Sequence, residues 1–159
     1  MGVSYADTVN KYLTKWKSDI YSNYISKNRK ASGKFGESLA VEMDGVGGAI
    51  TSATGYGKFI EFGRGATHGS AGLVPLHKLI YKWIDDKGLG YKDEKEHVSM
   101  SFAISKHIHK HGVKIGADRQ IVTPVITEQN INELQNELGN QVIANVVNEL
   151  KASWQSGQQ

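Results

Sequence analysis

One stretch determines the architecture around which the rest of the chain is arranged: Ser4-Tyr-Ala-Asp-Thr-Val-Asn-Lys-Tyr-Leu-Thr-Lys-Trp-Lys-Ser-Asp-Ile-Tyr-Ser-Asn-Tyr24. Apolar side chains recur here every three or four residues, which is the spacing of one face of an α-helix. Ser4 offers a side-chain oxygen to the first free N–H groups, and Asp7 places a carboxylate in the positive first turn. The pattern predicts a long amphipathic helix that ends near residue 28, with an apolar face made of Tyr5, Val9, Leu13, Trp16, Ile20 and Tyr24.

The period of the pattern changes after this helix. Residues 29–36 form a short basic connector, after which residues 38–43 alternate and place Leu39, Val41 and Met43 on one face. Residues 44–48 are typical of a turn and residues 49–54 of a returning strand, so we expect a β-hairpin. Two strands alone are only marginally stable. The hairpin must therefore lie on the helices or extend into a larger sheet, within the subunit or across a subunit boundary.

Helical periodicity returns in the second half of the chain. Periodicity alone leaves residues 56–63 undecided between helix and strand. A second helix is expected after Pro75 and ends at Gly88, a third runs from residue 97 to residue 111, and a last one begins after Thr127. Residues 113–126 are expected to form a short strand or an extended segment. The expected apolar faces are Leu76, Leu79, Ile80, Trp83 and Ile84 in the second helix, Met100, Ala103, Ile104, His107, Ile108 and His111 in the third, and Ile131, Leu134, Leu138, Val142, Val146 and Leu150 in the last.

These elements predict a single α+β domain over residues 1–159, because the length is close to the commonest domain size. We expect the two terminal helices to pack together as the main helical layer, with the other helices on a small antiparallel hairpin or sheet. Loops are expected at about 63–73 and 88–96, and a frayed tail at 155–159. The glycine-rich loop 63–73 is expected to be flexible in the free subunit and to contact a neighbouring protein on assembly.

Composition excludes several classes of protein. The chain has no cysteine, which removes disulfides, thiolate nucleophiles and cysteine-ligated zinc. It has no apolar run long enough to span a bilayer and no signal-peptide pattern at its N-terminus, so we expect synthesis in the cytoplasm and no membrane partner. The net charge is +3.

That charge is unevenly distributed. Residues 1–40 carry seven Lys and Arg against three Asp and Glu, whereas residues 121–159 carry one Lys against four Glu. This asymmetry has two interpretations. Two solvated helix faces differ in sign, or a basic end meets an acidic end within one subunit or between neighbours in a ring.

Two motifs invite a catalytic or ligand-binding interpretation. The glycine cluster at 63–69 lacks the Lys-Ser/Thr pair and the immediate helix of a phosphate-binding loop. His107 and His111 lie four apart on one helical face, but Ile108 stands where a zinc protease has Glu, and His109 points away. We therefore expect no cofactor and no metal.

Carboxylates are the remaining candidates for catalysis. Asp85 and Asp86 are adjacent and point apart on a helix. Glu61 lies between Ile60 and Phe62, and a carboxylate in apolar company needs a partner, which Arg64 or nearby backbone N–H groups can provide. No nucleophile–base pair accompanies it. We interpret Glu61 as a structural support for a chain reversal at Gly63 and predict no catalytic residue.

The segment that contains Glu61 resembles a known family. Tyr56-Gly57-Lys58-Phe59-Ile60-Glu61-Phe62-Gly63 is similar to the Tyr-x-x-(aromatic)-(aliphatic)-Glu-Phe-Gly signature of the neck and tail-completion proteins of long-tailed bacteriophages. The order of elements is also similar, as are Gly36-Glu37-Ser38-Leu39 before the first strand and Pro75-Leu76 before Trp83-Ile84 and Lys87-Gly88-Leu89. Many members have Thr after the final glycine, where this chain has Arg64.

The resemblance implies a structural virion protein rather than an enzyme. Members form a homo-oligomeric ring at the head–tail junction, contact other head–tail connector and tail proteins, and let viral DNA pass without sequence-specific binding. The structural or interface candidates are then Tyr56, Phe59, Glu61, Phe62, Gly63 and Arg64.

Other functions stay open at this point. A tail terminator that caps the tail tube fits the same features. A nucleic-acid-binding module would use Lys27, Arg29, Lys30 and Lys34 with Tyr21 and Tyr24 beside them. A metal-dependent enzyme would use His107 and His111.

Overall fold

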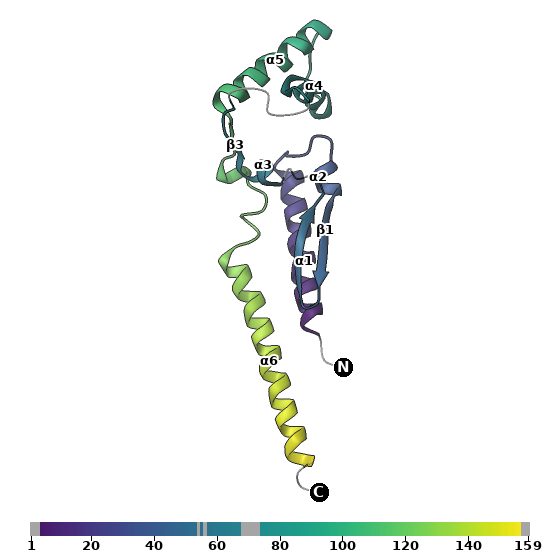
Figure 1. Ribbon diagram of the computed structural model, residues 1–159, viewed down its shortest axis with the longest axis vertical. Helices are drawn as coiled ribbons and strands as arrows, with labels where there is room; N and C mark the ends of the chain where they lie inside the picture. The colour runs from purple at the N-terminus through teal and green to yellow at the C-terminus, as the bar shows by residue number, and fades with distance from the viewer. Residues whose placement is uncertain (1–3, 54, 56, 68–73, 157–159) are drawn as a thin grey trace.

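The computed structural model describes residues 4–53, 55, 57–67 and 74–156. The molecule is elongated, with the α4–α5 pair at one end and the C-terminal part of α6 at the other (Figure 1). In chain order the elements are α1 Tyr5–Ser26, α2 Lys34–Glu37, β1 Leu39–Asp44, β2 Gly47–Ser52, α3 Gly57–Phe62, β3 Gly63–Arg64, α4 Leu76–Lys87, α5 Glu94–His111, β4 Val113–Lys114, a 3-10 helix Ala117–Arg119, and α6 Glu128–Ser156. The predicted α+β class is confirmed.

Helix α1 is the centre of the main core. The Ser4 side chain accepts a hydrogen bond from the Ala6 N–H at 3.2 Å, and Asp7 accepts one from the Ser4 N–H at 3.3 Å, so both predicted cap residues act as caps. The apolar face predicted for this helix is the buried one. The buried core comprises Leu13, Trp16, Ile20 and Tyr24 of α1 with Phe35, Ile121 and Val125.

The predicted hairpin lies on α1. Strands β1 and β2 pair antiparallel with Leu39 opposite Ser52. Gly45 turns the chain at φ +60°, which is the requirement at the first central position of a tight II′ turn. Leu39 and Val41 are half-buried against the core, as their alternation predicted. Met43, near the turn, is 37% exposed.

The segment that periodicity left undecided is a helix, α3, which ends where Gly63 takes φ +80°. The predicted loop 63–73 begins instead as strand β3, paired with β4. The Thr67 N–H then donates to the His109 carbonyl oxygen at 2.9 Å, so this end of the loop is tied down. The rest of the loop lies outside the residues that the structure describes.

Helices α4 and α5 pack together as a separate pair. Helix α4 follows Pro75 and ends at Gly88 in the left-handed conformation, as predicted. Helix α5 begins at Glu94, earlier than expected, because the Asp93 carboxylate caps it by accepting from the Glu96 N–H at 2.8 Å. The predicted loop 88–96 is therefore shorter.

The expected apolar face of α5 is not its most buried one. The buried side chains of this helix are His97, Ser101 and Ser105, spaced four apart, and Ile84 is the only buried apolar side chain of α4. Small polar residues let the two helices approach closely, so the apolar residues Ile104 and Ile108 are left half-buried beside the contact.

The segment 113–126 contains the short strand β4 and then turns, rather than one extended stretch. Its turns bring Ile121 and Val125 into the core against α1. Helix α6 follows, capped by Thr127, whose Oγ1 accepts from the Asn130 N–H at 3.2 Å.

Helices α1 and α6 pack together along the first part of α6, and polar groups line much of the seam. Glu137 accepts hydrogen bonds from Lys11 at 3.1 Å and Tyr12 at 2.9 Å, and Gln141 donates to the buried Thr8 hydroxyl at 2.6 Å. Leu134 and Leu138 are half-buried, but Val142, Val146 and Leu150 are exposed. Ile131, before them, is exposed as well, so the predicted helical layer covers only Leu134 and Leu138 of the expected apolar face of α6.

Candidate functional site

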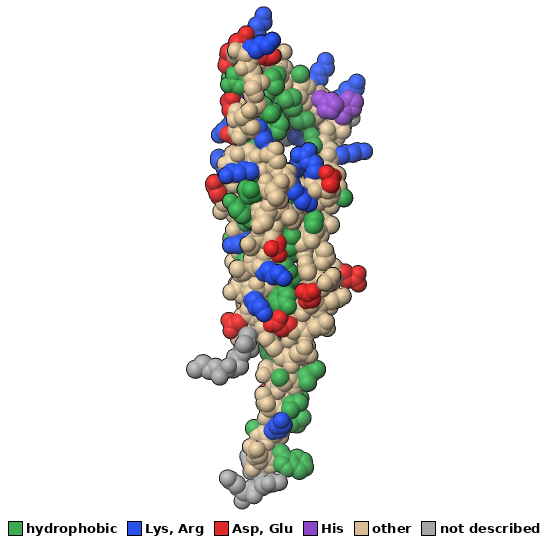
Figure 2. Space-filling view, turned by 180° about the vertical axis from the view of Figure 1, so that it is seen from behind, with side chains coloured by type: hydrophobic (Ala, Val, Ile, Leu, Met, Phe, Trp, Pro, Cys, Tyr) green, Lys and Arg blue, Asp and Glu red, His purple; other side chains and the backbone are tan. Residues whose placement is uncertain are grey.

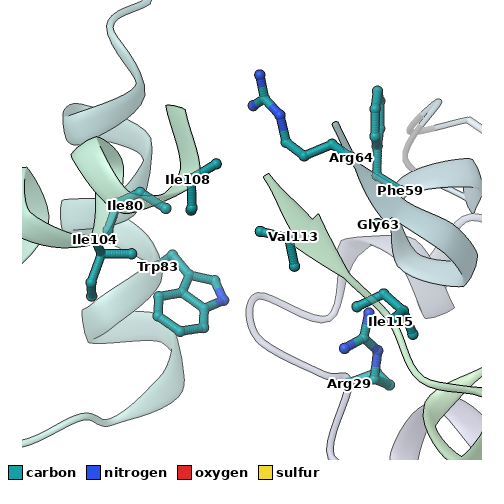
Figure 3. Close-up of a pocket in the computed structure, with 10 residues that line it drawn as sticks. All are labelled: Arg29, Phe59, Gly63, Arg64, Ile80, Trp83, Ile104, Ile108, Val113 and Ile115. Carbon is teal, nitrogen blue, oxygen red and sulfur yellow. The ribbon is translucent and has the colours of Figure 1, made fainter. Parts of the chain in front are cut away.

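A cleft of about 420 Å³ separates the α4–α5 pair from α3, β3 and β4 (Figure 3). Side chains of α4 and α5 form one wall, and residues around the two short strands form the other, with two arginines as the only charged groups among the lining residues that the structure describes. Its lining comprises Arg29, Phe59, Gly63, Arg64, Ile80, Trp83, Ile104, Ile108, Val113 and Ile115. The cleft is thus an apolar groove with cationic groups on one wall.

Two glycines hold the backbone segments that form the second wall. Gly63 has φ +80°, and a Cβ there would lie 1.9 Å from the Val113 carbonyl oxygen. Gly112 has φ +71°, and a Cβ there would lie 2.4 Å from the Arg64 carbonyl oxygen. Left-handed backbone and direct backbone contact both require glycine, so these residues permit the pairing of β3 with β4.

Glu61 anchors α3 to the turn that precedes α6. The carboxylate is 3% exposed and accepts four hydrogen bonds: Oε2 from the N–H groups of Ile121 and Val122 at 2.8 and 2.9 Å, and Oε1 from the N–H and hydroxyl of Thr123 at 2.8 and 2.6 Å. In the described part of the chain, neither of the expected partners, Arg64 or a backbone N–H group near Gly63, bonds to it. The donors lie about sixty positions further along the chain, so the carboxylate supports that distant turn rather than the chain reversal at Gly63. Its role is to fix residues 121–123, which carry part of the core.

The hydrogen bonds also determine the charge state of Glu61. Burial alone would raise the pKa of the carboxyl group, because it penalises the ionised form. The donors on Thr123, Val122 and Ile121 stabilise that form and outweigh burial, so the pKa of Glu61 is lowered. The carboxylate is consequently ionised at neutral pH and has no proton to give as a general acid.

The two arginines of the cleft differ in how strongly they are hydrogen-bonded to the rest of the chain. Arg29 donates from Nη2 to the Ile60 carbonyl oxygen at 2.7 Å, while its Nε is buried and has no hydrogen-bond partner among the described residues. Burial, and then the nearby Arg119, lower the pKa of Arg29. Arg64 makes one long contact, 3.4 Å, to the Thr67 hydroxyl. Arg64 therefore keeps more of its donors available to an anion than Arg29, whose unpartnered Nε is buried.

The aromatic residues of the signature segment face outward. Phe59 is 50% exposed and Phe62 is 60% exposed, and Phe59 lies at the edge of the cleft. Tyr56 lies outside the residues that the structure describes. Of the six candidates from the sequence, the structure therefore brings Phe59, Gly63 and Arg64 to the cleft and places Glu61 behind it.

His107, His109 and His111, which the sequence placed together on one helix, lie near the C-terminal end of α5. The rings of His107 and His111 lie 4.7 Å apart between centroids, and no third ligand joins them, since no group of three or more His, Cys, Asp or Glu side chains in the described part of the chain could hold a metal ion. His109 pairs with the Thr67 hydroxyl at 2.7 Å. These contacts support a structural role for His109.

His97 is a buried residue that sequence reasoning did not select. Its ring is stacked between Tyr81 and Tyr91, at centroid distances of 3.6 and 4.0 Å. Its Nε2 lies 3.0 Å from the Tyr81 carbonyl oxygen and 3.6 Å from Asp85. The stack closes the distal end of the α4–α5 pair, and Asp85, considered earlier for catalysis, here accepts a hydrogen bond from the Tyr91 hydroxyl.

The basic cluster considered for nucleic-acid binding is partly committed to the fold. Lys27 donates to the Gln120 carbonyl oxygen at 2.6 Å, Arg29 is bound to Ile60, and Tyr24 is buried against Phe35. Lys30 and Lys34 remain exposed.

The C-terminal part of α6 is the second surface with functional potential. We call residues 142–156 the arm. Every residue from 142 to 155 is exposed, and the large apolar side chains among them are Val142, Ile143, Val146, Val147, Leu150 and Trp154. None of the helices in the described chain is long and apolar enough to cross a membrane.

Comparison with known proteins adds no relative to this description. No family model, curated protein or solved structure matches the chain.

Proposed function

We propose that this chain is a structural subunit of a tailed-bacteriophage virion, a neck or tail-completion protein that forms a ring at the head–tail junction. Its partners would be copies of itself and the adjacent connector and tail proteins, and the proposal involves no reaction. The resemblance around Glu61 supplies the family, and the exposed arm supplies the physical support.

The arm is the observation that carries the proposal. A monomeric protein rarely exposes a contiguous row of large apolar side chains, because each leaves apolar surface in water. Here such a row runs from Val142 to Trp154 on one face of α6. The C-terminal part of this helix projects beyond the body of the molecule (Figure 1). This arrangement is the one expected of a subunit that completes its apolar contacts on assembly.

The cleft is an apolar surface in addition to the arm, and the presence of both supports a ring in particular. The cleft and the arm are different surfaces, so contact between unlike surfaces of successive subunits is heterologous, and heterologous contacts generate rings when the rotation closes. A tail terminator, which caps the tail tube, is a ring of the same kind and remains the alternative within this class.

The contacts of the basic residues favour a nucleic-acid-binding module less than a structural subunit. Two of its four expected basic residues, Lys27 and Arg29, hold backbone carbonyl groups of the same chain. A role in DNA passage needs no specific binding site, and the exposed Lys30 and Lys34 suffice for weak phosphate contacts.

Immunogold labelling of intact virions of the phage that encodes the chain tests the proposal. Label at the head–tail junction is the expected result. Absence of the chain from virions would overturn the proposal. Tails assembled in a head-defective background separate the two alternatives, because a terminator remains on them and labels their upper end, whereas a neck subunit does not.

A further inference from the structure

Two apolar surfaces without a partner lie at opposite ends of the molecule. Figure 2 shows hydrophobic side chains gathered near the α4–α5 end and again along the free end of α6. One surface is concave, the cleft with Ile80, Trp83, Ile104 and Ile108 on its α4–α5 wall. The other is convex, the arm with its row of branched side chains and a terminal Trp154 that is 75% exposed.

The exposed face of the arm is distinct from the face that packs on α1. Gln141 and Asn145 point toward α1, where they bond to Thr8 and Tyr5 at 2.6 and 2.8 Å. At 3.6 residues per turn, Ile143, Val147 and Leu150 lie on the other side of the helix. Packing of α6 on its own α1 therefore leaves the apolar face of the arm uncovered.

The arm cannot fill the cleft of its own subunit. Helix α6 is continuous for 29 residues, a length of about 43 Å at 1.5 Å per residue. It begins beside the body and runs away from the α4–α5 pair (Figure 1). Only the arm of another molecule can reach the cleft without unfolding of α6.

We infer that the arm of one subunit docks in the cleft of a second copy of this chain. The apolar row of the arm would lie against the isoleucines and Trp83 of the cleft, so that one contact covers both uncovered surfaces. One local charge match favours this occupant: Arg29 and Arg64 line the cleft, and Glu149 lies on one flank of the apolar face of the arm, while Lys151 lies on the other flank.

The inference deepens the proposed function, because it rests on self-assembly and names the two surfaces involved. Pairing of two arms with each other would be a different, isologous contact. That contact would cover the arms but leave both clefts open.

The absence of native cysteine allows a direct test by cross-linking. Two single variants are made in the full chain, Trp154→Cys on the arm and Val113→Cys on the cleft wall, and each is treated with a short bismaleimide alone and after mixing. Both positions are exposed, at 75% and 36%, so neither substitution removes a core contact. A variant with Lys92→Cys, on an exposed loop away from both surfaces, is the control for random collision.

The expected result is a covalent dimer in the mixture of arm and cleft variants and little in either variant alone. Dimers from Trp154→Cys alone would overturn the inference in favour of arm–arm pairing. If sedimentation shows multimers but no arm–cleft cross-link forms, the inference would also be overturned, while the self-assembly on which the proposed function rests would stand. A chain that stays monomeric at every concentration would remove the inference and the ring of the proposed function together.

A charge exchange tests the assigned contact independently. Glu149→Arg and Arg64→Glu are each expected to weaken self-association about tenfold through like-charge repulsion, and the double variant is expected to restore it. Equal loss in the single and double variants would exclude the pairing of these two residues.

Discussion

Helix α1 and the arm of α6 carry the same kind of apolar pattern but meet different surroundings. In α1 the row from Leu13 to Tyr24 is buried by the hairpin, Phe35 and the turn at 121–125. In the arm the row from Val142 to Trp154 has no cover within the subunit. Periodicity thus predicts which face of a helix is apolar, while the covering surface depends on elements far away in the sequence or in another molecule.

The two tryptophans offer the largest contrast. Trp16 is 6% exposed in the core, and Trp154 is 75% exposed on the arm. We expect Trp16→Ala to lower the free energy of unfolding by about 3–5 kcal/mol through the lost contacts and the cavity. Trp154→Ala should change it by less than about 0.5 kcal/mol in dilute solution.

Urea denaturation at low protein concentration measures both values, because dilution removes any stabilisation by self-association. Equal losses for the two variants would mean that Trp154 is already covered within the monomer.

Glu61 connects the core to the base of α6, so its loss should weaken the body. Replacement by Gln keeps the shape but places an N–H₂ group where a carboxylate oxygen accepts buried N–H donors. We expect Glu61→Gln to cost about 3 kcal/mol, since a buried charged acceptor with several donors is involved. Glu149→Gln on the arm is the matched control and should leave the urea midpoint unchanged. An unchanged midpoint for Glu61→Gln would remove its anchoring role.

Gly63 tests the wall of the cleft. Gly63→Ala forces a Cβ onto a left-handed residue and against the Val113 carbonyl oxygen, and we expect a loss of about 2 kcal/mol from backbone strain. At Gly65 a Cβ would meet nothing within 4 Å, so Gly65→Ala serves as control. Similar thermal midpoints for the two variants would contradict the backbone contact between β3 and β4.

The smallest expected effect is the pH dependence of the Glu61 anchor. Because the pKa of Glu61 is lowered in the folded chain, its stabilisation is fully present above the ordinary Glu value of about 4.3 and is lost as pH falls through the folded pKa. The difference in stability between the native chain and Glu61→Gln should therefore stay constant from pH 7 to pH 5 and narrow in more acidic solution. A difference in stability that widens as the pH falls would mean that the pKa of Glu61 is raised in the folded chain, and would contradict this prediction.

Much of the fold was predictable because its signals are local. The Ser4 cap, the hairpin turn at Gly45 and the stops at Gly88 and Gly112 each depend on a few neighbouring residues. Helix α3 was not predictable, because a segment of this length fits both the period of a helix and the period of a strand. The packed face of α5 was missed because small polar residues, such as Ser101, permit close helix packing that an apolar stripe does not report.

The site was predictable only in part for the same reason. Glu61 stood out because a carboxylate between apolar residues needs donors, but the donors at 121–123 lie sixty positions away. The cleft could not be foreseen, since its walls come from five separate parts of the chain. The arm was expected to be covered by α1, and only the geometry of α6 reveals that its last apolar residues extend beyond that cover.

Analytical ultracentrifugation over a wide concentration series tests most directly whether the apolar face of the arm is an assembly surface. The native chain is compared with Leu150→Lys, on that face, and with Asn148→Lys, on the opposite side of the same exposed helix. We predict that the native chain and Asn148→Lys associate as concentration rises, while Leu150→Lys remains monomeric with unchanged helix content. A native chain that stays monomeric throughout the series, or a Leu150→Lys variant that associates equally well, would contradict the account.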